Sequence, residues 1–198
     1  MNELIRTSAW VLLPLLAMCA SATACDPEPT PAPEAAATFR NNALFCDAYH
    51  GQTVTMQSVR HGSMPYLYEA GDTVALSNTP QFPRSSMHWR VHCEDGNIFF
   101  QNAVNDEWMI ASPPGMLVFL TAPFENGMLS AWARWTAEPD PSANPQEFCS
   151  RYRFHHWHPG QPTTPRNSMD GRGNFLKMTN ECNAASTFQL CILDTATE

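Results

Sequence analysis

The chain has 198 residues, a formal net charge of −8 at pH 7 and 43% hydrophobic residues. This length favours one domain and is sufficient to bury a hydrophobic core. The negative charge argues against nucleic acid as a partner, because nucleic-acid binding requires a basic surface. It also argues against electrostatic binding to anionic lipids.

The first 24 residues have the features of a cleavable export signal. Arg6 belongs to a short polar start, and an apolar run extends from Ala9 to Ala20. This run is too short for a permanent membrane span, and Pro14 interrupts it. The small residues at 22–24 match the positions that a signal peptidase reads. We therefore predict that the chain is exported.

Cys25 follows the small residues directly, and this arrangement resembles the lipobox of bacterial lipoproteins. The resemblance implies a lipid on the Cys25 thiol and a membrane-anchored protein of the cell envelope, facing the periplasm or the surface. Ordinary cleavage before Cys25, followed by secretion, is the alternative. The acidic, proline-rich segment from Asp26 to Glu34 is expected to stay extended as a tether. The expected division is a signal at 1–24, a lipid-bearing tether at 25–43 and a domain at 44–198.

The cysteines indicate disulfide bonds. The chain contains seven cysteines, of which Cys19 leaves with the signal. Cysteines in an exported chain are by default disulfide-bonded. No Cys-x-x-Cys motif occurs, which argues against a zinc ribbon or a thioredoxin-type redox site. The pairing does not follow from the spacing of the cysteines alone.

Short apolar runs, separated by glycine, proline, asparagine and aspartate, dominate the chain after Leu44. Many short strands at such spacing predict an all-β sandwich or barrel. The expected strands lie at 53–58, 73–77, 88–93, 97–101, 108–110, 116–120, 132–135, 174–178 and 188–193.

A weak internal repeat runs through this region. Each copy contains apolar runs followed by a single large aromatic residue. The copies comprise 65–68, 74–78 and Trp89; 107–110, 118–122 and Trp132; and 175–180 and Phe188. A second similarity relates 45–49 to 148–152, since both begin Phe-Cys and end in Tyr.

Three copies of about four short strands resemble a β-trefoil, and the runs at 53–89 and 97–132 are similar to fascin-like and ricin-B-like repeats. The resemblance covers about Leu44 to Leu193, although the ricin-type Gln-x-Trp signature is missing. It implies that the first and fourth strands of a repeat are neighbours. That arrangement implies the disulfides Cys46–Cys93 and Cys149–Cys191.

The aromatic residues suggest a binding function. The trefoil resemblance places Trp89, Trp108 and Trp132 in the core. The remaining candidates for an exposed ring that stacks on a sugar are Trp157 and Trp135. Polar side chains that could bind sugar hydroxyls occur in two segments, one at 170–174 and one beside Trp108. The predicted ligand-binding residues are Trp157, Trp135, Asp170, Arg172 and Asn174, and a further polar group beside Trp108 comprises Asn102, Asn105 and Asp106.

Histidines provide the main alternative. In the run from His155 to His158, His156 and His158 share one strand face and could ligate a metal. A polar loop explains the same run, and we predict neither a metal nor another cofactor. His88, Arg90 and His92 are expected on the solvated face of a strand whose other face carries Trp89.

The sequence thus predicts a non-catalytic binding module at the bacterial cell envelope, with a glycan as ligand. No serine-hydrolase, zinc-protease or phosphate-loop motif is present. The first alternative is a protein-binding module, such as a protease inhibitor or an adhesion domain that contacts an envelope protein through the loop from His158 to Arg172. The second is a metal-dependent enzyme that uses the histidines at 155–158.

Overall fold

The computed structural model describes residues 31–59, 63–81, 83–113, 115–122, 131–141, 149–156, 167–180 and 186–193. The export signal, Cys25, Trp157 and His158 lie outside these residues, so their roles stay predictions. Within the described ranges, no helix is both long enough and apolar enough to cross a membrane.

The described strands form three consecutive units of four. The two-residue turn Asp95-Gly96, with φ of 49° and 73°, joins two strands in the left-handed geometry that tight hairpins favour. The first unit contains β1 (Thr53–Ser58), β2 (Tyr66–Ala70), β3 (Thr73–Ser77) and β4 (His88–Glu94). The second contains β5 (Asn97–Asn102), β6 (Trp108–Ile110), β7 (Phe119–Thr121) and β8 (Trp135–Pro139). The third contains β9 (Cys149–His156), β10 (Asn167–Asp170), β11 (Lys177–Thr179) and β12 (Thr187–Ile192). Short 3₁₀ helices, η1 (Arg84–Met87) and η2 (Ala131–Ala133), precede β4 and β8.

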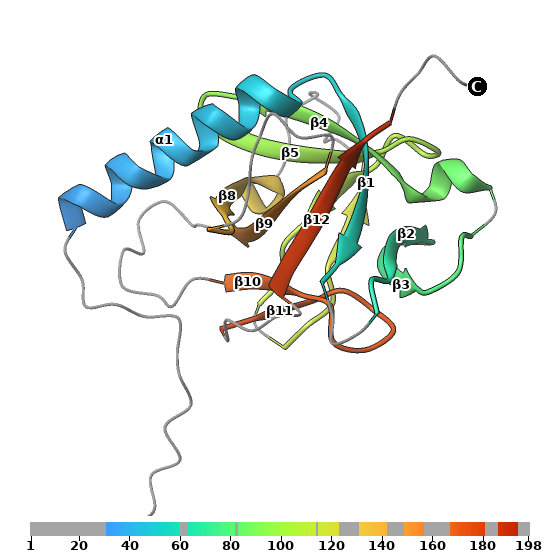
Figure 1. The fold of residues 1–198 in the computed structure, drawn as a ribbon. Coiled ribbons are helices and arrows are strands. Elements are labelled where there is room, and N and C mark those ends of the chain that lie inside the picture. Colours follow the sequence, from blue (N-terminus) through green and yellow to red (C-terminus); the bar gives the residue numbers. More distant parts are fainter. Residues whose placement is uncertain are drawn as a thin grey trace, which may run out of the picture.

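The first and fourth strands of the three units close into an antiparallel barrel (Figure 1). Among the described residues the pairings run β1–β4, β4–β5, β5–β8, β8–β9, β9–β12 and β12–β1. Because the last pairing returns to β1, the ring leaves no edge of its own open. The second and third strands form the hairpins β2–β3, β6–β7 and β10–β11. The fold is a β-trefoil.

The three hairpins meet in a circuit of backbone hydrogen bonds. The amide of Val74 donates to the carbonyl of Val118 (3.2 Å), and the amide of Val118 donates to the carbonyl of Leu176 (2.9 Å). The amide of Leu176 donates back to the carbonyl of Val74 (2.9 Å). All three residues are fully buried. These residues therefore occupy equivalent positions in the three units.

One large aromatic residue from each unit fills the core. The indole Nε1 of Trp89 donates to the carbonyl of Leu67, and the indole Nε1 of Trp135 donates to the carbonyl of Met109. Phe188, near the start of β12, is the counterpart in the third unit. All three rings are fully buried, which confirms the core prediction for Trp89.

One detail of the predicted repeat is wrong. The second unit uses Trp135 in the core, whereas Trp132, which the repeat pattern selected, is 39% exposed. The two residues are three positions apart, and only the pairing of β8 with β5 and β9 distinguishes them. In the third unit, the predicted run at 175–180 contains the third strand, β11, and the second strand, β10, precedes it.

A helix, α1 (Pro31–Tyr49), covers the end of the barrel away from the β10–β11 hairpin (Figure 1). Proline is tolerated in the first turn of a helix, and the alanines that follow favour helix formation. Gly51, with φ of 77°, allows the chain to turn away after the last helical residue. The boundary expected at residue 44 therefore falls inside a helix, and its last turns belong to the folded domain.

Aromatic side chains attach this helix to the barrel. The ring of Phe45 lies 5.0 Å from that of Tyr152 and 5.7 Å from that of Phe154, both from β9. Tyr49 stacks on Phe45 with ring centroids 4.8 Å apart. The side-chain amide of Asn42 donates to the carbonyl of Gly96, and its oxygen accepts the backbone amide of Ala137.

The similarity between 45–49 and 148–152 is not structural, since the first segment is helical and the second contains the start of β9. Tyr49 and Tyr152 nevertheless meet, with ring centroids 5.8 Å apart.

Both predicted disulfides, Cys46–Cys93 and Cys149–Cys191, are present. Cys149 and Cys191 are directly opposite each other on β9 and β12, the first and fourth strands of a unit, as the trefoil resemblance implied. Cys46 lies on α1 rather than on a first strand. The Cys46–Cys93 bridge therefore ties the helix to the end of β4.

Candidate ligand-binding surface

The structure separates the residues predicted to bind a ligand. Trp135 is fully buried, so the prediction that it stacks on a ligand is wrong. Trp157 lies outside the described residues. Asp170 and Arg172 lie together, with Asp170 Oδ2 accepting from Arg172 Nε at 2.6 Å, and both line a shallow depression. Asn174 is exposed but does not line this depression.

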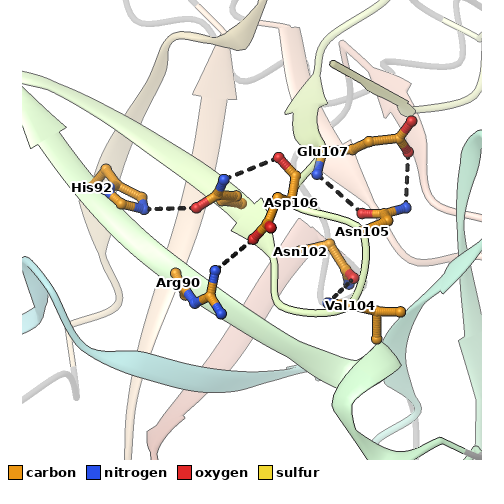
Figure 2. Close-up of polar contacts among 8 residues, drawn as sticks. Arg90, His92, Asn102, Val104, Asn105, Asp106 and Glu107 are labelled. Carbon is orange, nitrogen blue, oxygen red and sulfur yellow. Dashed lines mark hydrogen bonds and ion pairs between the residues drawn. The ribbon is translucent and has the colours of Figure 1, made fainter. Parts of the chain in front are cut away.

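A denser group of polar side chains lies on the outside of β4, β5 and β6, around the loop that joins β5 to β6 (Figure 2). We call this surface the β4–β6 face. Its members are Arg90, His92, Gln101, Asn105, Asp106, Glu107 and Trp108.

Asn102, at the end of β5, holds the loop of the β4–β6 face in place. It is fully buried; its Nδ2 donates to the carbonyl of Ser86 (3.0 Å), and its Oδ1 accepts the amide of Val104 (2.9 Å). Within the loop, Asn105 accepts the amide of Glu107 and donates to its carboxylate. The loop is therefore fixed at both ends before any ligand arrives.

Asp106 is the centre of the β4–β6 face. Its φ of 59° is in the left-handed region, which aspartate tolerates better than most residues. Its Oδ1 accepts from Arg90 Nη1 at 2.6 Å, and its carbonyl accepts from Gln101 Nε2 at 3.0 Å (Figure 2). The ion-paired side chains are 45% and 66% exposed, and such surface pairs contribute about 1 kcal/mol or less to stability. The pair therefore mainly orients the two charges.

Gln101 also determines the tautomer of His92. Since its Nε2 donates to Asp106, its Oε1 is the atom 3.1 Å from His92 Nε2, so that nitrogen carries the proton. Burial lowers the pKa of His92, the hydrogen bond from His92 to Gln101 opposes this effect, and the nearby His50 and Arg90 lower the pKa further. His92 therefore favours the neutral form.

Trp108 completes the β4–β6 face. Its ring lies 4.9 Å from that of His92 and meets the ring of Phe99 edge-on at 6.4 Å. The residue is only half-buried, so the prediction that it belongs to the core is wrong. The predicted polar neighbours have different roles, because Asn102 supports the loop whereas Asn105 and Asp106 face outward.

Gln101 and His92 are not among the ligand-binding residues predicted from the sequence. The Asp95-Gly96 turn could have predicted the position of Gln101, because this turn fixes the β4–β5 register and places Gln101 opposite Arg90. The prediction that His88, Arg90 and His92 share the outer face of β4 agrees with the burial of Trp89 and Val91 between them.

The lowered pKa of His92 predicts that acid destabilises the fold through this residue. Below its ordinary pKa of 6.5, the unfolded chain binds a proton that the folded protein resists, so stability falls as the pH falls through this value. The melting temperature of the wild-type protein should therefore fall relative to that of His92→Gln as the pH is lowered from about 7.5 to 5. Parallel pH curves for the two proteins would contradict the expectation.

His155 and His156 do not form a metal site with the other described residues. His155 contacts Ser168 and Glu138, whereas His156 Nδ1 donates to the carbonyl of Arg134 and its ring stacks on Trp132. The described parts of the chain contain no group of three histidine, cysteine, aspartate or glutamate residues suited to a metal. His158, the third histidine of the predicted cluster, lies outside them.

Ser168, His155 and Glu138 form a chain of contacts that resembles a catalytic relay. His155 Nδ1 lies 2.7 Å from Ser168 Oγ, and its Nε2 lies 3.0 Å from a carboxylate oxygen of Glu138. Ser168 is fully buried and His155 is 3% exposed, so a substrate has no direct access to the hydroxyl. We interpret these contacts among the three side chains as a structural polar connection between β8, β9 and β10.

No protein-family model matches the chain, and no curated protein matches its sequence. Solved structures share its fold. A ricin B-like lectin from Macrolepiota procera, in complex with lactose, is 15% identical with a TM-score of 0.51, and the match covers 72% of this chain and 96% of the lectin. The designed threefold-symmetric protein ThreeFoil is 11% identical with a TM-score of 0.51, over 71% of this chain and 99% of the design.

An enzyme is also among these structures. The GlcNAcα1-4Gal-releasing endo-β-galactosidase from Clostridium perfringens is 16% identical with a TM-score of 0.54. The match covers 72% of this chain but only 33% of the enzyme, so the chain spans about a third of its length. At these identities the matches show a shared β-trefoil fold.

Proposed function

We propose that this domain is a non-catalytic carbohydrate-binding module and that the β4–β6 face binds the sugar. The observation that carries the proposal is a half-buried tryptophan beside exposed charged and amide groups that the fold already holds in place. The fold it shares with a lectin solved with lactose supports the same function.

The β4–β6 face has the chemistry that a sugar requires. An aromatic ring such as Trp108 offers a flat apolar surface for the C–H face of a pyranose. The carboxylates of Asp106 and Glu107 accept hydrogen bonds from hydroxyls, and the guanidinium of Arg90 donates them. Because Asn102 and Asn105 hold the loop, binding costs little conformational entropy.

Glycan-array binding followed by calorimetry tests the proposal. The fragment should begin at Asp26, because α1 belongs to the fold. Trp108→Ala and Asp106→Asn should each weaken binding of the selected glycan by about tenfold or more. Asparagine tolerates the left-handed backbone conformation of residue 106, so Asp106→Asn removes the carboxylate charge without straining the loop.

Trp132→Ala is the matched control, because Trp132 is an exposed tryptophan outside the β4–β6 face. It should bind as the parent does. A blank array from folded, oxidised protein would overturn the proposed function. Loss of binding in Trp132→Ala alone would overturn the proposed surface.

The proposal includes the location that the sequence suggests. Export through the signal at 1–24 and lipid attachment at Cys25 would hold the module at the bacterial cell envelope. Mass spectrometry of the mature amino terminus distinguishes a lipidated Cys25 from an unmodified cleavage product.

The protein-binding alternative rests on the loop from His158 to Arg172, most of which lies outside the described residues. The exposed Val104, at the tip of the β5–β6 loop, is an apolar group that a protein partner could cover. Pull-down with envelope proteins, repeated with Val104→Ser, tests this alternative if the array is blank.

A further inference from the structure

A second concave site lies on the third unit, outside the β4–β6 face. It is a shallow depression with a volume of about 300 Å³, near the lower end of the range for ligand sites. Gly115, from the second unit, forms one wall, and its amide donates to the carbonyl of Met178 (2.7 Å). Its polar lining includes Asp170, Arg172, Lys177, Thr179 and Asn180.

A buried carboxylate positions the arginine of this depression. Asp170 is only 3% exposed; its Oδ1 accepts the amide of Arg172 (2.8 Å), and its Oδ2 accepts from Nε and Nη2 (2.6 Å each). Gly171 between them packs so closely on Ser58 that a Cβ there would overlap the Ser58 hydroxyl. The guanidinium therefore has a fixed orientation, although the Arg172 side chain is 52% exposed.

Lys177 supplies a second positive charge. It lies on β11 directly opposite Asp170 on β10, and it is the only lysine in the chain. Its side chain is exposed, and its ammonium has no hydrogen bond or ion pair in the described structure. The charges of Asp170, Arg172 and Lys177 sum to +1, although the net charge of the whole chain is −8.

We propose that this depression, the Arg172–Lys177 pocket, binds the carboxylate of an acidic saccharide such as a uronic acid. An arginine held by a buried carboxylate and an unpaired ammonium form a local cationic site for an anion. Thr179 and Asn180 provide hydroxyl and amide groups for the sugar ring. The β4–β6 face carries Asp106 and Glu107 and disfavours the same anion, so the two sites select different sugars.

Calorimetry with methyl glucuronide and methyl glucoside tests this proposal. The glucuronide should bind about tenfold or more tightly than the glucoside, and its affinity should fall as salt increases. Lys177→Gln should remove most of this preference. Arg172→Lys should weaken glucuronide binding as well, because lysine keeps the charge but loses the planar fork.

Arg90→Gln, which removes a cation from the β4–β6 face, is the matched control and should leave glucuronide binding unchanged. Equal binding of the two glycosides, or an unchanged affinity in Lys177→Gln, would overturn the pocket. Inorganic sulfate that binds as tightly as the glucuronide would overturn the saccharide specificity. Trp108→Ala should keep glucuronide binding, so failure of this proposal is distinguishable from failure of the proposed function.

Discussion

Replacing Trp135 by alanine is expected to lower the free energy of unfolding by about 3–5 kcal/mol. The side chain is fully buried, and its Nε1 donates to the carbonyl of Met109 at 3.1 Å. The substitution leaves a cavity between the barrel and the β6–β7 hairpin and an unpaired carbonyl beside it. Urea denaturation followed by circular dichroism measures the loss.

Two further variants make the Trp135 experiment specific. Trp135→Phe should cost only about 1–2 kcal/mol, because Phe188 already serves the equivalent position in the third unit. Trp132→Ala should cost about 1 kcal/mol or less, since that ring is partly exposed and stacks only on His156 among the ring contacts described. A larger loss in Trp132→Ala than in Trp135→Ala would contradict the core assignment.

Replacing Phe45 by alanine is expected to cost a similar amount, about 3–5 kcal/mol. Phe45 is fully buried beneath α1 and contacts Tyr49, Tyr152 and Phe154 at ring distances of 4.8, 5.0 and 5.7 Å. The Cys46–Cys93 bridge keeps the helix attached, so the measured loss reports the packing at the barrel end. The same denaturation experiment, under oxidising conditions, measures it.

The adjacent Leu44 is the matched control for Phe45. It is 49% exposed on the outer side of the helix, and Leu44→Ala should change stability by about 0.5 kcal/mol or less. If Phe45→Ala were as mild as Leu44→Ala, the helix would be an attachment without a stabilising role. Such a result would restore a domain boundary near residue 44.

The fold was predictable from the sequence because it depends on local alternation and repeated spacing, whereas both disulfides were implied by the resemblance to a β-trefoil. Runs such as Trp89, Val91 and Cys93 on alternate positions identify a strand and its inner face. The helix α1 gave no comparable signal. Among the side chains of α1 that the structure describes, Asn42, Phe45 and Tyr49 contact the barrel, and the sequence before them resembles a proline- and alanine-rich linker.

The candidate site was harder to predict because its members meet across strands. Asp170 and Arg172 are two residues apart, and their pairing follows from a turn-rich local sequence. Gln101 contacts His92 and Asp106 only because the β4–β5 hairpin and the following loop bring three segments together. Trp135 and Trp132 are too close in sequence for spacing to identify which one enters the core.

The circuit of hydrogen bonds through Val74, Val118 and Leu176 has a consequence for how the chain folds. Each unit contributes one donor and one acceptor, so any two units alone leave one amide and one carbonyl of the circuit without their partner. A chain truncated to two units is therefore expected to be less stable than the full domain. The last link joins Leu176 to Val74, and such distant contacts make folding slow, on the order of milliseconds to seconds. In the export that we propose, an unfolded chain would emerge whole before this link has to close.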